Sequence, residues 1–421
     1  MGTTNSRTNY PIVELIVHAV LAVVLALGVS YLHSQQPVAY LHLISEDWHG
    51  EYTTAISFLV LAVCFFAIGF RRKGLHRWMA WGIAAAGFFV GMEELSWGQR
   101  ILGISTPGPL KERNLQGELT LHNLVFLPQL HQIAGFVLLG WAAVSLTNLK
   151  ALLERLGVPV LPPPLLPWFL LTAYYFIVYP SVKADEVGEF FLGLGLALLG
   201  LYAWFGSGHR PQFNQAGHRL LVSLIALATL GLMSEALTRL YSGSLSYRLN
   251  TAAARDYPHR EMYEQSDMLF AYIYEHPEYL RENTRIEHAR ILLKQNLIDR
   301  AGPILLGALE DVQRRNSDDA DDLQTEGEIL VLLDRNDEAE KVLARAVSTL
   351  EKQLETMTAG NAKGEGDESA RLLWSLAKCE TQRGNLEQSR RRYDEALATP
   401  PSAQLSKKIR IWGRTQGWTG G

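Results

Sequence analysis

Acidic, histidine and amide side chains gather near the ends of several apolar stretches in the first 240 residues. The densest group is Gly91-Met-Glu-Glu-Leu-Ser-Trp-Gly-Gln-Arg100, where the third apolar stretch ends. Carboxylates at membrane depth are costly and usually mark a function. Related groups recur in later stretches, and we expect all of them to meet at one membrane boundary: Glu93, Glu94, Trp97, Arg100, Glu118, His122, Asn123, Lys183, Asp185, Glu186 and Glu189.

Helical spacing indicates which of these side chains share a face. Residues three or four apart are neighbours on a helix, so we expect Glu93 to lie beside Trp97 and Asp185 beside Glu189. Consecutive residues point about 100° apart on a helix. Glu93 and Glu94 therefore face different directions, and at most one of them faces any given pocket.

Three interpretations of this cluster stay open. In the first, a divalent metal (Zn²⁺, Mn²⁺ or Fe²⁺) is bound by carboxylates and an imidazole, which suit these ions. The metal then activates water to attack an ester, an amide or a phosphoester at the membrane surface. The ligands expected under this interpretation are Glu94, Glu118, His122, Asp185 and Glu189.

In the second interpretation, a carboxylate acts as general acid or base, without a metal, on a lipid or a lipid-linked glycan. In the third, the charges pair with one another and form a rigid membrane base. If the protein is an enzyme, the expected catalytic residues are Glu93, Glu94, His122 and Glu186. The expected substrate-binding residues are Trp97, Arg100, Asn123 and Lys183, with Arg100 and Lys183 holding a phosphate headgroup.

Other ionisable groups lie within the apolar stretches. Glu14 and His18 are four residues apart near the start of the first stretch, and we expect them to pair with each other rather than to form a proton path. His131 follows Pro128, which should kink its helix. His131 either bonds into that kink or points toward the polar cluster.

Seven apolar stretches must position these side chains. A spanning helix needs about 20 mostly apolar residues. The first stretch exceeds a signal core of about 7–15 residues and lacks a small-x-small cleavage site, so we expect it to be retained. The expected spans are 11–32, 54–70, 78–95, 123–146, 165–182, 187–206 and 219–239.

The charges of the short loops predict the orientation, because cytoplasmic loops carry an excess of Lys and Arg. The loop 71–77 is strongly basic, and two alternate loops carry Lys150 with Arg155 and Arg210 with Arg219. The loop after the first span has neither Lys nor Arg. We therefore expect a multi-pass protein of a bacterial inner (plasma) membrane, with a cytoplasmic N-terminus and a periplasmic second half.

The second half is charged, helix-forming and repetitive. Three sets of residues show the same successive intervals of 12, 4 and 3: Ala289, Ala301, Leu305 and Ala308; Gly327, Ala339, Leu343 and Ala346; Ala377, Ser389, Tyr393 and Ala396. Small residues at these positions let two antiparallel helices touch, while the larger residue fills the groove between them.

This pattern resembles the tetratricopeptide repeat over roughly 265–401, and the copy at 372–400 is the best match. The resemblance implies a concave surface that binds a protein or peptide and performs no catalysis. In the first half, the motif Glu-Glu-Leu-Ser-Trp-Gly-Gln-Arg100 together with Leu121-His-Asn123 resembles a pattern of uncharacterised bacterial multi-pass membrane proteins. That resemblance covers about 91–124 and implies no activity.

Charge and cysteine content exclude several classes. The net charge is −4 over 421 residues and no long Lys/Arg run occurs, so we expect no nucleic-acid partner. Cys64 and Cys379 lie in different halves without metal-type spacing, so we expect two small apolar fillers rather than a disulfide.

The predicted fold is all-α, with a polytopic helix bundle followed by a soluble helical-repeat domain. The expected divisions are a transmembrane domain at 1–240, a linker at 241–262, a repeat domain at 263–402 and a tail at 403–421. The leading functional hypothesis is a membrane-embedded enzyme acting on lipid or lipid-linked glycan, whose repeats recruit an envelope partner. The competing hypothesis is a non-catalytic membrane scaffold that works through its repeats.

Overall fold

The computed structural model describes residues 12–45, 48–102, 130–206, 216–242, 245–315, 317–359, 366–399 and 401–418. Every regular element in these ranges is helical, which confirms the predicted all-α class. The chain divides into two compact units, Met1–Tyr279 and Leu280–Gly421. The sequence instead places a linker at 241–262 and starts the second domain at 263.

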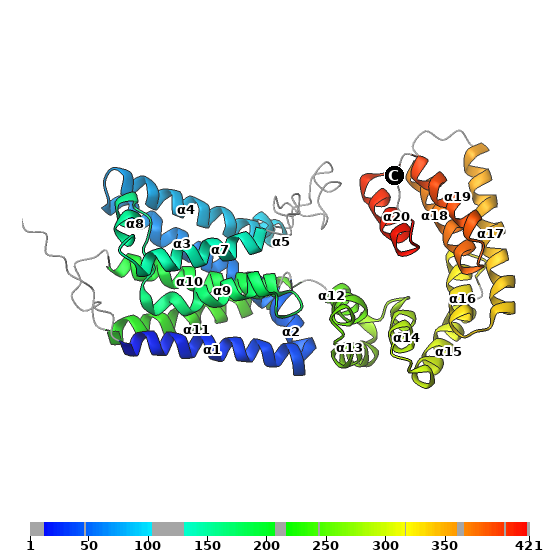
Figure 1. Cartoon of the computed structure of the whole chain (residues 1–421), viewed down its shortest axis with the longest axis horizontal. Coiled ribbons are helices and arrows are strands. Elements are labelled where there is room, and N and C mark those ends of the chain that lie inside the picture. The colour runs from blue at the N-terminus through cyan, green and yellow to red at the C-terminus, as the bar shows by residue number, and fades with distance from the viewer. Residues whose placement is uncertain are drawn as a thin grey trace, which may run out of the picture. The chain divides into compact units, whose positions relative to one another are not determined.

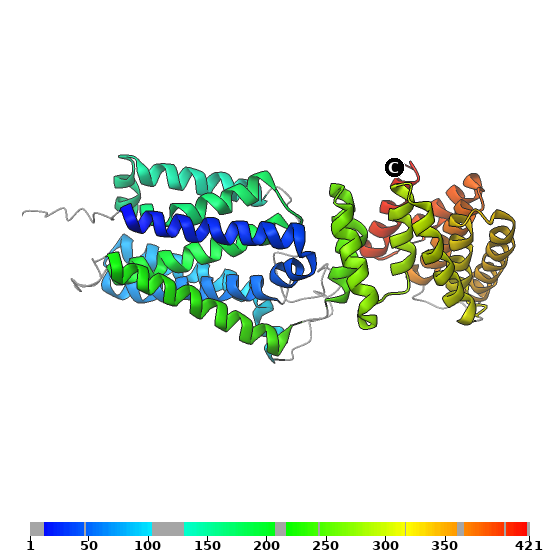
Figure 2. The same ribbon diagram turned by 90° about the horizontal axis from the view of Figure 1, so that it is seen from below.

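The longer helices of the first unit lie side by side as a bundle, as both ribbon views show (Figure 1, Figure 2). Each of the seven apolar stretches overlaps one of them. Helix α8 lies at one end of the bundle, and α2 and α5 lie at the other. The bundle helices and their short companions are α1 (Ile12–Gln35), α2 (Pro37–Ile44), α3 (His49–Arg71), α4 (Leu75–Glu94), α5 (Gln99–Leu102), α7 (Leu130–Leu146), α8 (Lys150–Leu156), α9 (Leu166–Val178), α10 (Ala184–Gly206) and α11 (Ala216–Tyr241).

Several of these helices suit a membrane. Within the described residues, four helical segments are long and apolar enough to cross one: α1, the run Pro37–Arg71, α10 and α11. A fifth is added if α7 and α8, which are bent by 104°, count as one span. The apolar segment Pro163–Val178 is shorter. These helices are consistent with the expected membrane protein.

Helix α3 packs closely against its neighbours because glycines face it. A Cβ on Gly91 of α4 would lie 3.0 Å from the Ala55 carbonyl oxygen, and one on Gly200 of α10 would lie 3.1 Å from the Leu61 Cα. Small residues let helix backbones approach in a membrane, where packing rather than the hydrophobic effect drives association. The glycines therefore explain why α4 and α10 both lie against α3.

The segment expected as a linker is largely helical and completes the first unit. It forms α12 (Ser246–Thr251), the π-turn η5 (Ala252–Asp256) and the 3₁₀ turn η6 (Pro258–Arg260), and α13 (Tyr263–Glu275) follows. Its apolar residues recur at helical intervals, and Leu249, Ala253 and Tyr257 are fully buried. The Tyr257 ring stacks on His33 of α1 at 5.4 Å. This burial is why the segment belongs to the first unit.

The second unit consists of consecutive helix pairs with one continuous core. Helices α14 and α15, α16 and α17, and α18 and α19 pack as pairs, and α20 packs on the last of them. Each residue of the three repeated sets is buried between these helices. The elements are α14 (Thr284–Lys294), α15 (Ile298–Arg315), α16 (Ala320–Leu332), α17 (Asn336–Ala359), α18 (Gly366–Gln382), α19 (Leu386–Ala398) and α20 (Ala403–Thr415).

Candidate functional sites

The Glu93–Trp97 element ends α4 in an unusual backbone conformation. Ser96 and Trp97 adopt φ values of +48° and +54°, which are uncommon for residues other than glycine. The Trp97 indole donates a hydrogen bond to the carboxylate of Glu93, which is buried. The expectation that these two side chains lie together is therefore confirmed. Such backbone strain costs energy and often accompanies function.

The α9–α10 turn gathers the second part of the predicted cluster. Lys183 Nζ lies 3.2 Å from Glu186 Oε1, and His131 Nε2 lies 2.9 Å from Glu189 Oε1. Tyr179 and Asp185 line the same cleft beside this turn. Of the two expectations for His131, the structure thus favours the one that points it toward the cluster.

Other predicted site residues lie outside what the structure describes. These are Glu118, His122 and Asn123, together with the side chain of Arg100 and the kink at Pro128. Among the described side chains, no group of three His, Cys, Asp or Glu residues is arranged to hold a metal ion. Two of the five expected ligands, Glu118 and His122, lie outside these described residues. In the described part, carboxylates of this cluster form hydrogen bonds or ion pairs with other side chains of the protein, as the pairing interpretation predicts.

The opposite end of the bundle holds a buried ion pair that the sequence analysis missed. Arg219 Nε and a terminal guanidinium nitrogen donate hydrogen bonds to the Glu14 carboxylate at 2.8 and 2.7 Å. Glu14 is fully buried and Arg219 nearly so. This bidentate geometry joins the first turns of α1 and α11. The assignment of Arg219 to a cytoplasmic loop is therefore wrong, because it lies one turn inside a helix.

A chain of hydrogen bonds extends from this ion pair. The Tyr202 hydroxyl donates to Glu14, and His18 Nε2 lies 3.1 Å from the same hydroxyl. The Trp168 indole donates to His18 Nδ1 at 3.2 Å. Since Trp168 donates to Nδ1, the ring proton of neutral His18 belongs on Nε2, from which it donates to Tyr202.

The prediction that Glu14 and His18 pair directly with each other is therefore wrong. The two side chains are joined through the Tyr202 hydroxyl, and Glu14 pairs with Arg219 instead. A permanent guanidinium charge with two parallel N–H groups matches a carboxylate better than an imidazole one turn away. The available signals were the arginine at the start of an apolar stretch and the tyrosine near the end of another.

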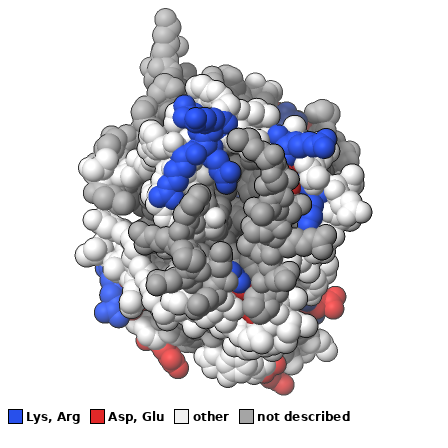
Figure 3. Space-filling view, turned by 90° about the vertical axis from the view of Figure 1, so that its left-hand side faces the viewer, with Lys and Arg blue, Asp and Glu red and all other residues white. Residues whose placement is uncertain are grey.

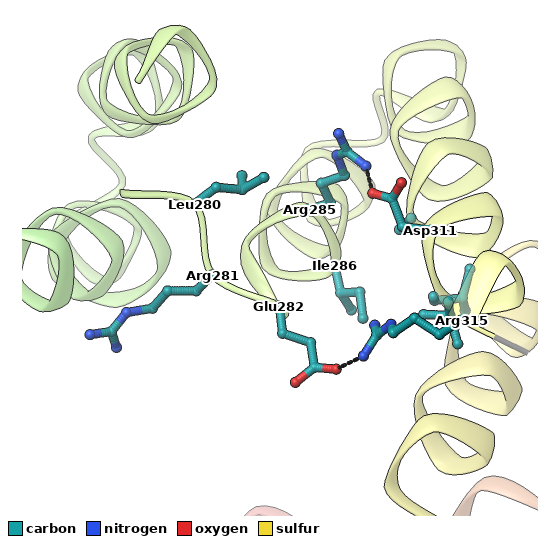
Figure 4. Close-up of a pocket in the computed structure, with 10 residues that line it drawn as sticks. Leu280, Arg281, Glu282, Arg285, Ile286, Asp311 and Arg315 are labelled. Carbon is teal, nitrogen blue, oxygen red and sulfur yellow. Dashed lines mark hydrogen bonds and ion pairs between the residues drawn. The ribbon is translucent and has the colours of Figure 1, made fainter. Parts of the chain in front are cut away.

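The second unit carries a small pocket of about 260 Å³ beside α14, α15 and α16. Arg285 pairs with Asp311 on one side of Ile286, and Glu282 pairs with Arg315 on the other, as Figure 4 shows. The apolar part of the lining comes from Leu280, Ile286, Ala308, Val312 and Ile329. The pocket thus combines an apolar floor with charged edges whose ion pairs link α14 to α15.

A second polar surface of this unit joins α14, α16 and α18. Arg290 forms an ion pair with Glu328, and Gln382 donates to the same carboxylate at 3.3 Å. Lys378 Nζ lies 3.9 Å from the centre of the Trp374 ring. Burial raises the pKa of Glu328 and lowers the pKa of Lys378. The three helices are therefore held in register by half-buried charges.

No family model, curated protein or solved structure matches this chain. Its function therefore has to be argued from the geometry of its own residues.

Proposed function

We propose that this protein is a multi-pass membrane scaffold whose helical-repeat unit recruits a protein partner. The base is the seven-helix bundle, with its N-terminus in the cytoplasm, in a bacterial inner membrane. The second unit acts as a tetratricopeptide-like adaptor on the periplasmic side. The observation that carries the proposal is the apolar pocket beside α14, α15 and α16, where four of the charged edge residues pair with one another.

The charge distribution on the bundle supports this orientation. Exposed Arg71 ends α3 and exposed Arg72 and Lys73 follow it, while exposed Lys150 and Arg155 lie on α8. Figure 3 looks onto this end of the bundle and shows Lys and Arg side chains gathered over its upper part. Short loops rich in Lys and Arg stay in the cytoplasm. This end is therefore assigned to the cytoplasmic side.

The pocket defines the kind of contact that a partner makes. Arg285 and Arg315 are each engaged by carboxylates of the unit itself, so much of their charge is balanced within the unit. The floor offers branched apolar side chains, among them Ile286 and Val312. An apolar side chain anchored in a pocket, surrounded by polar contacts, is the common pattern of interface hot spots. We therefore infer a partner segment with a single apolar anchor.

Site-specific photo-crosslinking tests this function in intact cells. A photoreactive residue replaces Leu280, which lines the pocket and is 38% exposed, and a matched control replaces Leu386, which is 59% exposed on α19 of the same unit. One discrete adduct is expected from position 280 and none from position 386. Equal adducts at both positions would contradict the proposal.

A second candidate function is a lipid-processing enzyme at the periplasmic boundary. The strained Ser96 and Trp97 beside buried Glu93 favour it, since backbone strain gathers at functional sites. Glu94, His122 and Glu186 then complete the catalytic set, with Lys183 holding a phosphate. The test is turnover of labelled membrane lipids by the purified protein and by Glu93→Gln. Activity that persists in Glu93→Gln would contradict a catalytic role for that residue.

A further inference from the structure

An open cleft of about 460 Å³ lies at the α9–α10 end of the bundle. It is bordered by the turn between those two helices and by the η5–η6 segment. Its volume falls in the range of about 300–1,000 Å³ that is typical of small-molecule sites. The lining residues are Tyr179, Val182, Lys183, Asp185, Arg255, Asp256, His259 and Arg260.

The lining carries both signs of charge. Its cations are Lys183, Arg255 and Arg260, and its carboxylates are Asp185 and Asp256. Arg255 Nε lies 2.8 Å from Asp256, and a terminal nitrogen of Arg260 donates to the Tyr179 carbonyl oxygen at 3.1 Å. A guanidinium has five N–H donors. Each arginine is thus positioned by one contact and keeps donors for a ligand.

The turn that forms one wall is held in a costly conformation. Tyr179 and Lys183 adopt φ values of +54° and +55°. The turn is fixed from behind, where His33 accepts a hydrogen bond from the Val182 amide at 3.2 Å and Tyr40 donates to the Val182 carbonyl oxygen. Strained residues persist only where the surroundings hold them. This wall is therefore rigid before any ligand arrives.

An apolar strip lies on α9, the helix that ends beside the cleft. Leu170, Tyr174 and Val178 recur every four residues on one face of α9, and each is about half exposed. Tyr179, which follows the last residue of α9, borders the cleft. A membrane lipid has the same arrangement, with a polar headgroup continued by apolar chains. A soluble phosphate compound has no acyl chains that could cover the strip.

We propose that this cleft binds the phosphoethanolamine headgroup of a membrane lipid. Arg255, Arg260 and Lys183 contact the phosphate, while Asp185 and Asp256 accept hydrogen bonds from the ammonium group. The acyl chains lie along the α9 strip. A purely anionic headgroup would leave both carboxylates facing negative charge, and a trimethylammonium group has no N–H to donate. The site therefore distinguishes phosphoethanolamine from phosphoglycerol and phosphocholine lipids. The inference concerns the bundle alone and does not depend on the pocket of the repeat unit.

Native mass spectrometry of the full-length protein in detergent tests this assignment. Dioleoyl lipids with ethanolamine, glycerol or choline headgroups are titrated separately. Ethanolamine lipid is expected to bind more tightly than the other two. The double variant Arg255→Gln/Arg260→Gln should lose about tenfold in affinity for it, as expected when two charge-assisted contacts are removed. The matched control is Arg239→Gln, because Arg239 is 78% exposed at the end of α11.

Further outcomes separate the parts of the proposal. Asp185→Asn/Asp256→Asn should reduce the preference for ethanolamine over choline lipid and keep phosphate-dependent binding. Water-soluble phosphoethanolamine should compete only weakly, since it lacks chains to cover the strip. Equal binding of all three lipids by the wild type would overturn the headgroup assignment. Competition by soluble phosphoethanolamine as strong as that by the lipid would overturn the membrane source.

Discussion

Arg219 and Glu14 are 205 residues apart in the sequence, and they form a buried ion pair with two parallel hydrogen bonds. The pair joins the first turns of α1 and α11. Tyr202, near the end of α10, donates a hydrogen bond to Glu14 and so connects α10 to the pair. Trp168, through His18, adds α9 to the same network. Four helices are therefore joined at one end of the bundle by side-chain hydrogen bonds rather than by apolar packing alone.

Removing one member of this ion pair should be far more damaging than removing both. A buried charge left without its partner costs about 3–5 kcal/mol, whereas replacing a whole buried pair by apolar residues is often close to neutral. We expect Arg219→Met to lose stability of that order and Glu14→Leu/Arg219→Met to recover most of it. Denaturant unfolding in mild detergent measures both. A double variant no more stable than Arg219→Met would contradict this account.

The glycines of α4 provide a test of the bundle packing. A Cβ on Gly87 would lie 3.1 Å from the Phe58 carbonyl oxygen of α3, whereas one on Gly82 of the same helix meets nothing within 4 Å. Both positions are helical, so Gly→Val changes helix propensity similarly at each. We expect Gly87→Val to be less stable than Gly82→Val by about 1–3 kcal/mol, as overpacking usually costs. Thermal unfolding in detergent compares them, and equal melting temperatures would contradict close α3–α4 packing.

Contacts between residues close in sequence could be predicted from their spacing, whereas contacts between residues far apart in sequence could not. The Glu93–Trp97 contact follows from residues four apart, and the buried repeat positions follow from small residues at intervals set by two antiparallel helices. Partners far apart in sequence leave no such pattern. The sequence alone therefore suggests that Arg219 is a loop charge, whereas the structure places it on α11 beside Glu14. Likewise, Tyr257 looks like part of a linker until His33 provides the surface on which its ring stacks.

Metal analysis decides between the pairing and metal-binding interpretations of the polar cluster at the ends of α4 and α9. His131 pairs with Glu189, and Lys183 pairs with Glu186, so these carboxylates are already stabilised by protein groups. We expect purified protein to contain well under one metal ion per chain and its melting temperature to be unchanged by a chelator. Stoichiometric metal that disappears in both Glu94→Gln and His122→Ala, without unfolding, would establish the metal-binding interpretation instead.

Thiol reactivity tests the packing of the repeat unit. Cys379 is fully buried on α18, and burial, followed by the nearby Glu380 charge, raises the pKa of its thiol to about 12. Because the thiolate is the reactive form, roughly one thiol in ten thousand is ionised at pH 8. In a Cys64→Ala background we expect negligible maleimide labelling between pH 7 and 9 until denaturant is added.

The matched control for this labelling is Glu387→Cys on the neighbouring helix α19. The Glu387 side chain is 96% exposed, so a cysteine there should have an ordinary pKa of about 8.5. Its labelling should be complete in the folded protein and should accelerate about tenfold per pH unit below that pKa. Mass spectrometry counts the adducts on each thiol. Rapid labelling of Cys379 in folded protein would instead show that the α18–α19 pair opens readily.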